Sequence, residues 1–157
     1  MMEKEERTLQ TEQEMNEDSI NLLRECNAGC KSATGSIEQI LPMISNDELR
    51  TLTERYQKLH ENYGVECNKK LHREGEEGKE PNPVIKAGAW LSTEVKLAFR
   101  SDTERLAACL FDGCHMGIRS LLQYVHKYPA ACEEAKHMAY RLIGLEEDFR
   151  EELKRFL

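Results

Sequence analysis

The stretch Ala28-Gly29-Cys30 is followed by Ile37, and the same pattern returns at Asp112-Gly113-Cys114, which is followed by Leu121. An offset of 84 residues relates the two copies (29 to 113, 30 to 114). Beyond the next turn an offset of 86 continues the match and carries one set of apolar positions onto another: Leu52, Tyr56, Leu59 and Tyr63 onto Met138, Leu142, Leu145 and Phe149. The repeat predicts a protein built from two helical hairpins of one kind.

The composition favours long amphipathic helices. A chain of 157 residues has the length of one domain, and a domain of this size buries about two-thirds of the surface of its unfolded chain. Charged residues make up 32% of the sequence and only four Pro interrupt it, which is more typical of helices than of sandwiches or barrels. The formal net charge of -7 argues against nucleic-acid binding, because that function depends on clustered Lys and Arg.

The sequence shows no signal for a membrane or for secretion. No apolar run approaches the roughly 20 residues that a membrane-spanning helix needs. The start of the chain, Met1 to Asp18, is acidic and lacks the basic and apolar regions of a signal peptide. We therefore expect a cytoplasmic protein without a membrane partner. The six Cys lie inside helical patterns, and in a reducing compartment they are expected to be buried thiols.

Two long helices are expected in the first hairpin. The first ends near Ile44, and its inward positions recur every three or four residues at Ile20, Leu23, Asn27, Cys30, Thr34, Ile37, Leu41 and Ile44. Ser45-Asn46-Asp47-Glu48 has the form of a capping box that starts the second helix. The inward positions of that helix are Leu49, Leu52, Tyr56, Leu59, His60, Tyr63, Cys67 and Leu71.

The second hairpin follows a long connection. Glu74 to Pro83 contains two Gly and two Pro and is expected to be a loop. A short helix from Pro83 to Phe99 comes next, and it would span on the order of 25 Å at 1.5 Å per residue, enough to carry the chain back along a bundle. Ser101-Asp102-Thr103-Glu104 is a second capping box before the third helix, and Pro129 is expected to open the fourth.

These elements predict an all-α fold, namely a four-helix bundle of two antiparallel hairpins joined by a long crossover containing a short helix. Residues 19–157 are expected to form this single domain. Residues 1–18 form an acidic N-terminal extension, for which a helical and a disordered state both stay open.

The repeat also carries a family resemblance. Over roughly Ser19 to Leu157 the chain resembles a bacterial family of small ferritin-like four-helix bundles of unknown function. In that family a Gly-Glu pair stands where this chain has Gly29-Cys30 and Gly113-Cys114, and Gly113 to Leu121 is the best local match. The resemblance implies a ferritin-like bundle, in which metal ligands are one Glu from each of two helices and a Glu-x-x-His pair from each of the other two.

The resemblance assigns these ligand positions to residues that have changed chemistry. The positions are Cys30, His60 with Tyr63, Cys114, and Glu146 with Phe149. Two carboxylates have become thiols and both His positions have become aromatic, so iron storage and oxygen chemistry are not expected. The remaining set would meet at the bundle centre: Cys30, His60, Cys114 and Glu146.

Two interpretations of this set stay open. In one, the two sulfurs, one nitrogen and one oxygen hold a zinc ion, which accepts all three atom types in tetrahedral geometry. In the other, which we favour, the thiols are small buried side chains and His60 and Glu146 form a hydrogen-bonded pair or reach the bundle edge. Cys26 lies one turn before Cys30 and would add a ligand for a soft ion such as Cu(I). The other thiols, Cys67, Cys109 and Cys132, are scattered along the pattern.

Small residues on the first and third helices predict a close approach of the two backbones, with Gly29, Gly113 and Gly117 as the main positions. Gly inside a helix costs about 1 kcal/mol relative to Ala, so a packing reason is expected. The alternative is an open pocket lined by Cys30, Cys114, Thr34 and Tyr63.

The sequence contains no complete catalytic constellation, so we expect a non-catalytic structural or protein-interaction role. Apolar Trp90, Leu91 and Phe99 on the connecting helix favour a homodimer, although packing of that helix against its own bundle explains the same residues. The alternative function is a zinc or soft-metal sensor or carrier at the four central residues, and zinc is the one cofactor it would require. The sequence does not identify a protein partner.

Overall fold

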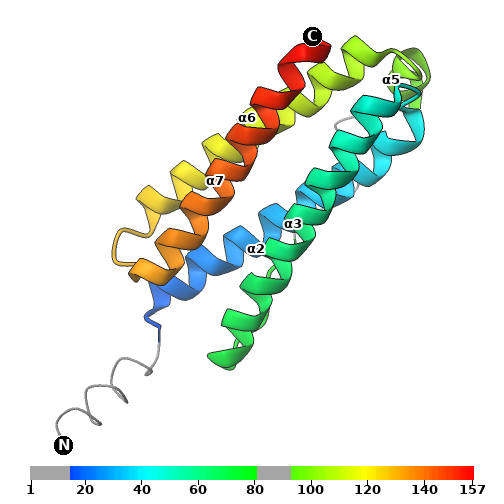
Figure 1. The fold of residues 1–157 in the computed structure, drawn as a ribbon. Coiled ribbons are helices and arrows are strands. Elements are labelled where there is room, and N and C mark those ends of the chain that lie inside the picture. The colour runs from blue at the N-terminus through cyan, green and yellow to red at the C-terminus, as the bar shows by residue number, and fades with distance from the viewer. Residues whose placement is uncertain (1–14, 81–92) are drawn as a thin grey trace, which may run out of the picture.

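The computed structural model describes residues 15–80 and 93–157, and every regular element in these ranges is a helix (Figure 1). The four long helices are α2 (Glu17–Ile40), α3 (Asp47–Arg73), α6 (Thr103–Lys127) and α7 (Glu133–Leu153). The short helices are η1 (Leu41–Met43), α5 (Thr93–Phe99) and η2 (Lys154–Phe156). The predicted all-α class is confirmed. In the described part of the chain no helix has the length and apolar character needed to cross a membrane.

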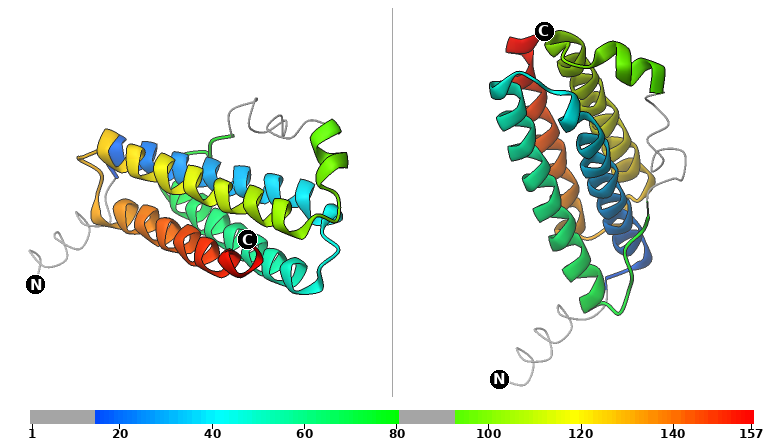
Figure 2. Two further views of the ribbon diagram at one scale, coloured as in Figure 1. Left: turned by 90° about the horizontal axis from the view of Figure 1, so that it is seen from above. Right: turned by 90° about the vertical axis from the view of Figure 1, so that its right-hand side faces the viewer.

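Contacts at the ends of the helices fix their directions. The amide of Ser101, before α6, donates to the carbonyl oxygen of Met43, after α2, at 2.9 Å. At the opposite end, Lys70 and Arg73 of α3 pair with Glu134 of α7 at 2.7 and 2.8 Å. Helices α3 and α6 therefore run in the same direction, and each is antiparallel to its partner in the hairpin (Figure 2).

The shared direction of α3 and α6 is the arrangement for which the long crossover was predicted. The short helix predicted from Pro83 to Phe99 falls in the connection between these two helices. Its last seven residues form α5, Thr93–Phe99, whereas the remainder, with Trp90 and Leu91, lies outside the described residues. The long crossover as a whole therefore stays a prediction.

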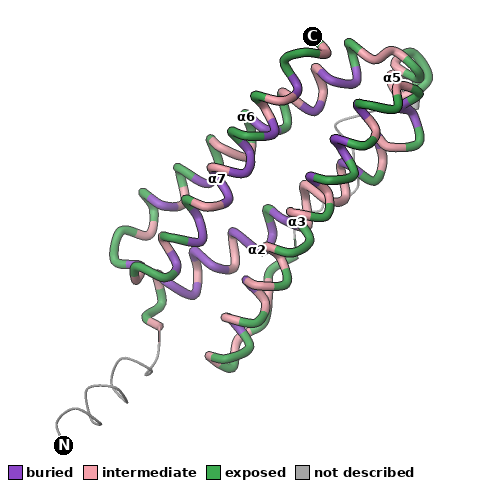
Figure 3. The backbone as a smooth tube through the Cα atoms, in the orientation of Figure 1, coloured by how far each residue is buried: buried purple, intermediate pink, exposed green. Residues whose placement is uncertain are grey.

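A continuous apolar core fills the space between the hairpins, and the buried positions form stripes on the inward faces of the helices (Figure 3). Helix α2 packs against each of the other three long helices. Every long helix contributes at least one Leu with no exposed surface: Leu22, Leu23, Leu49, Leu71, Leu106 and Leu153. Each such side chain contributes about 1.5–3 kcal/mol by burial, so the apolar stripes read from the sequence supply most of the drive to assemble the bundle.

Two helix starts lie one residue later than predicted. The N-cap of α3 is Asn46, whose side-chain oxygen accepts from the amide three residues later at 2.9 Å. The N-cap of α6 is Asp102, which accepts from the equivalent amide at 3.1 Å. The capping boxes predicted to begin at Ser45 and Ser101 are therefore wrong. In both cases the side chain of the residue after the Ser, an Asn or an Asp, accepts the hydrogen bond from the free backbone N–H.

Helix α7 begins after its predicted start at Pro129. The amides of the intervening turn are bound by the first residues of α2: Ala130 N–H donates to Asp18 Oδ2 at 3.0 Å, and Cys132 N–H donates to Ser19 Oγ at 2.7 Å. These amides are held by tertiary contacts and the segment stays non-helical, so the prediction of a helix start at Pro129 is wrong.

The cap of α7 generates a prediction about stability. Cys132 occupies the N-cap position but makes no side-chain capping bond. Cys132→Ser places a hydroxyl oxygen there that can accept from a free amide, so we expect the free energy of unfolding to rise by about 1 kcal/mol. Urea denaturation followed by circular dichroism measures this. Cys109→Ser, in the interior of α6, is the matched control, and an equal response of the two variants would contradict the capping account.

Candidate functional site

A buried acid–base pair joins the two hairpins at the centre of the bundle. His60 comes from α3 and Glu146 from α7, and their side chains are only 2% and 10% exposed. The imidazole Nε2 is hydrogen-bonded to Glu146 Oε1. The pairing expected for these two residues is therefore present, and both groups are inside the core.

The second ring nitrogen determines how the pair is protonated. Nδ1 of His60 lies 2.6 Å from the carbonyl oxygen of Tyr56, and a carbonyl only accepts hydrogen bonds, so Nδ1 carries a proton. The contact with Glu146 is then either an imidazolium donating to a carboxylate or a carboxylic acid donating to a neutral ring. Both states leave the pair without net charge, which lowers the cost of burying it.

Glu146 raises the pKa of His60. Burial alone lowers this pKa, because it penalises the imidazolium, but the hydrogen bond and the negative charge of Glu146 outweigh that effect, and the carbonyl of Tyr56 adds to the rise. The net shift is upward. His60 in the folded protein therefore keeps its proton to a higher pH than an ordinary His does.

Cys114 on α6 is the second side chain bound to Glu146. Burial raises the pKa of this thiol, and the charge of Glu146 and a hydrogen bond to it raise the pKa further. The thiol is therefore protonated near neutral pH and donates to the carboxylate. A reactive cysteine needs the opposite shift, towards thiolate, so Cys114 is a structural donor in this arrangement.

Gly117 provides the space for the Glu146 carboxyl group. A Cβ atom at position 117 would lie 3.3 Å from Glu146 Cδ and 3.4 Å from its Cγ and Oε2. Gly29 and Gly113 are exposed, and a Cβ at either position would meet nothing within 4 Å. The close backbone approach predicted for the small residues is therefore wrong for Gly29 and Gly113, which face open space at the surface. Gly117 instead makes room for a side chain of α7.

Cys30 has a partner that the repeat did not indicate. Its thiol is hydrogen-bonded to Cys67 on α3, and it also lies within reach of the charge of Glu146. Burial raises the pKa of Cys26, and the neighbouring Cys67 raises it further. A Cβ at Gly64 would lie 3.3 Å from Cys30 Cβ, so the missing side chain lets α2 and α3 approach here. The sequence pattern did not pair Cys67 with Cys30, because it gave only the position of each thiol along its own helix.

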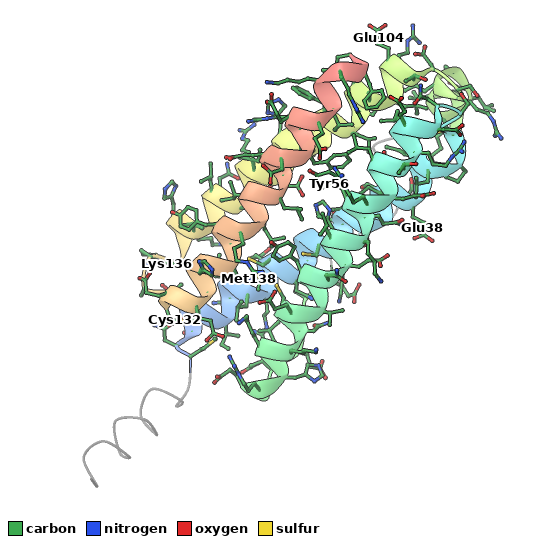
Figure 4. The ribbon with its side chains drawn as sticks, in the orientation of Figure 1. Glu38, Tyr56, Glu104, Cys132, Lys136 and Met138 are labelled. Carbon is green, nitrogen blue, oxygen red and sulfur yellow. The ribbon has the colours of Figure 1, made fainter. Side chains whose placement is uncertain are left out.

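Tyr56 makes a second link between α3 and α7, one turn from His60. Its ring stacks on Phe149 with centroids 4.4 Å apart and planes 4° from parallel, and its hydroxyl donates to Glu152. Figure 4 shows Tyr56 between α3 and α7. Glu152 also accepts from Arg55 at 2.5 Å. Phe149, which the resemblance places at a former ligand position, thus packs against an aromatic ring.

The structure brings Cys30, His60, Cys114 and Glu146 to one region of the core, where their polar atoms bind one another or Cys67. Within residues 15–80 and 93–157, no group of three or more His, Cys, Asp or Glu is arranged to hold a metal ion. Spacing did carry a signal for Cys67, which lies on the buried stripe of α3 two turns after His60. A shallow depression of about 360 Å³ lies between the start of α3 and the end of α7 and shares no residue with this cluster.

Comparison with known proteins identifies a similar fold. No family model matches the chain, and no curated protein matches it. The structure is similar to the crystal structure of a DUF305 fragment from Deinococcus radiodurans, with a TM-score of 0.67 and 12% sequence identity over 91% of this chain and 97% of that one. At this identity the likeness shows a shared fold alone.

Gly117, which faces Glu146, and Gly113, which faces open space, give a matched test of the space around Glu146. Gly113→Ala meets open space, so we expect it to raise the free energy of unfolding by about 1 kcal/mol through helix propensity. Gly117→Ala pushes against the Glu146 carboxyl group, so it should lose that gain or destabilise the protein. Equal gains for both variants in urea denaturation would show that Glu146 does not depend on the gap.

The raised pKa of His60 makes stability depend on pH in a defined direction. The folded protein binds the His60 proton more tightly than the unfolded chain, so this contribution is complete below the ordinary His pKa of 6.5 and is lost as pH rises through the higher folded pKa. In Glu146→Gln burial outweighs the remaining effect of the Tyr56 carbonyl, so the folded pKa of His60 falls below the ordinary value. The local slope of stability against pH should then invert.

Urea denaturation at a series of pH values from about 5.5 to 8 measures both slopes, within the range where His is the side chain that ordinarily titrates. Glu147→Gln, an exposed neighbour on α7, makes the same chemical change outside the core and should keep the wild-type slope. A variant Glu146→Gln with an unchanged slope would contradict the assignment of the pH dependence to this pair.

Proposed function

We propose that this protein is a ferritin-like bundle of the bacterial cytoplasm that acts as a non-catalytic structural or protein-interaction module. The internal repeat, the shared direction of α3 and α6 and the similarity to the DUF305 fragment support this fold. A long crossover between α3 and α6 completes the proposed topology.

The observation that carries the proposal is that the polar groups at the centre are bound to one another. His60 is hydrogen-bonded to Glu146 through Nε2, the nitrogen that a metal would need. Cys114 donates to the same carboxyl group, and Cys30 is bound to Cys67. These bonds stabilise the protein without any ligand, so they explain why the four residues meet at this place.

The residues at the centre of this bundle do not fit the di-iron centre of ferritin-like proteins. Such a centre uses carboxylates and imidazoles, whereas Cys30 and Cys114 offer thiols, and Tyr63 and Phe149 offer aromatic rings. Phe149 is committed to its stack with Tyr56. Iron storage and oxygen chemistry are therefore not part of the proposed role.

The surface of the α6–α7 hairpin supports the interaction role. Several large apolar side chains there face solvent in the isolated chain: Met116 at 62% exposure, Tyr140 at 52% and Leu122 at 37%. Apolar side chains and Tyr are common anchors of protein interfaces. We expect this hairpin to contribute to a homodimer. Phe99, which the sequence offered as a dimer contact, instead packs against the core of its own chain.

The alternative role is a metal sensor or carrier. The convergence of Cys30, His60, Cys114 and Glu146 on one region is the observation in its favour. Zinc would require His60 to release Glu146 and Cys30 to release Cys67, with loss of the thiol protons. Binding would therefore compete with the hydrogen bonds that hold the hairpins together.

Sedimentation of the untagged protein together with elemental analysis tests the proposal. We expect a dimer that contains no stoichiometric metal and retains none after zinc is added and free metal removed. A double variant with Met116→Lys and Tyr140→Lys should weaken self-association at least tenfold, since losing two apolar anchors removes about 2 kcal/mol or more.

Val65→Lys is the matched control, because Val65 is 52% exposed on α3. A monomer at all concentrations, or a dimer that both lysine variants weaken equally, would contradict the role of the α6–α7 surface. One retained zinc per chain that is lost in Cys114→Ser would replace the proposal with the metal-binding alternative.

A further inference from the structure

Three thiols gather between α2 and α3, apart from the acid–base pair. Cys26 and Cys30 lie one helical turn apart on the inward face of α2. Cys67 lies on α3 one turn after Gly64, the residue that packs against Cys30. Their exposures are 0%, 2% and 0%. The three sulfurs therefore come from two helices that pack closely, at the point where Gly64 lacks a side chain.

The thiols are neutral in this setting. Burial and the neighbouring thiol raise the pKa of Cys26, and the hydrogen bond to Cys67 together with burial raises the pKa of Cys30. If the complex of a ligand with these thiols is charged, burying it in this core costs a large desolvation free energy. Three thiolates around Cu(I) or Zn²⁺ leave a negative complex, close to the negative charge of Glu146.

We propose that Cys26, Cys30 and Cys67 form a binding site for trivalent arsenic, taken up as arsenous acid. The product is an arsenic atom bonded to three sulfurs in a trigonal pyramid, and it has no net charge. Three As–O bonds break and three As–S bonds form, and each thiol proton leaves in a molecule of water. Arsenic stays trivalent, so the step needs no oxidant or reductant.

The proposed site requires the three Cys side chains to rearrange. Among the described residues no group of three such ligands already stands at metal-binding geometry, and in the free protein the proton of a thiol holds Cys30 against Cys67. Loss of the protons as water removes that hydrogen bond, and rotation of each Cys about its one side-chain torsion brings the sulfurs together. The backbones of α2 and α3 are already in close contact at Gly64.

Access to the thiols is controlled by the segment that follows α3. Residues 74–80 lie along α2 (Figure 2), held by ion pairs from Arg24 to Glu76, from Lys79 to Glu25, and from Lys31 to Glu80. Gly78 packs directly on the buried amide of Asn27, the residue next to Cys26. Partly exposed ion pairs contribute little each, so this segment can detach without unfolding of the bundle.

Native mass spectrometry of the reduced full chain with arsenite as the probe tests the proposal. We expect one adduct per chain, whose mass corresponds to addition of one arsenic and loss of three protons, and a melting temperature that rises with arsenite concentration because the ligand binds the folded state. Affinity should change less than threefold between pH 6 and 8, since neutral thiols form a neutral product. Zinc or Cu(I) bound by these thiols would release protons.

The variants Cys67→Ala and Cys26→Ala should each lose the three-sulfur adduct and at least tenfold in affinity. Cys132→Ser removes a thiol at the turn before α7, where the Cys132 amide donates to Ser19 Oγ, and this variant should bind as the wild type does. Circular dichroism confirms that each variant is folded, and if one alanine variant does not fold, the other still decides the result.

No adduct, an adduct that has lost fewer than three protons, or binding unaffected by Cys67→Ala and Cys26→Ala would overturn the proposal. The site is independent of the proposed interaction role. Glu146→Gln and the lysine variants of the α6–α7 hairpin should bind arsenite normally, so failure of one proposal is distinguishable from failure of the other.

Discussion

The hydrogen bond between His60 and Glu146 is the constraint around which the centre of this bundle is organised. It joins α3 of the first hairpin to α7 of the second. Both groups are buried, so removing one partner leaves an uncompensated charge in the core and lowers the free energy of unfolding by about 3–5 kcal/mol. Two further polar groups bind the members of this pair. The Tyr56 carbonyl accepts from the ring and the Cys114 thiol donates to the carboxyl group.

The same constraint explains the small residues of the core. A Glu side chain fits between α6 and α7 only because Gly117 leaves room for its carboxyl group. On the other side of the bundle Gly64 lets α2 approach α3, which brings Cys30 to Cys67. A glycine in a helix costs about 1 kcal/mol, and at these two positions packing of a polar side chain offsets that cost.

The polar residues of the core form two groups with different chemistry, one around Glu146 and one around Cys67. Around Glu146 the groups are charged or strongly polar and bind one another, so they specify how the two hairpins meet. Around Cys67 the groups are neutral thiols with weak hydrogen bonds, so they remain open to a ligand that forms covalent bonds to sulfur. The proposed interaction role and the proposed arsenic site therefore use separate parts of one core.

The sequence by itself determined the all-helical class, the hairpins and the stripes that form the core, because apolar spacing of three and four residues is a local property of each helix. Its repeat also placed His60 and Glu146 together. Tertiary structure alone decided that Cys67 joins Cys30, that Gly117 rather than Gly113 meets Glu146, and that α7 starts after Pro129. Those outcomes depend on the distance and rotation between helices, which spacing along one chain does not encode.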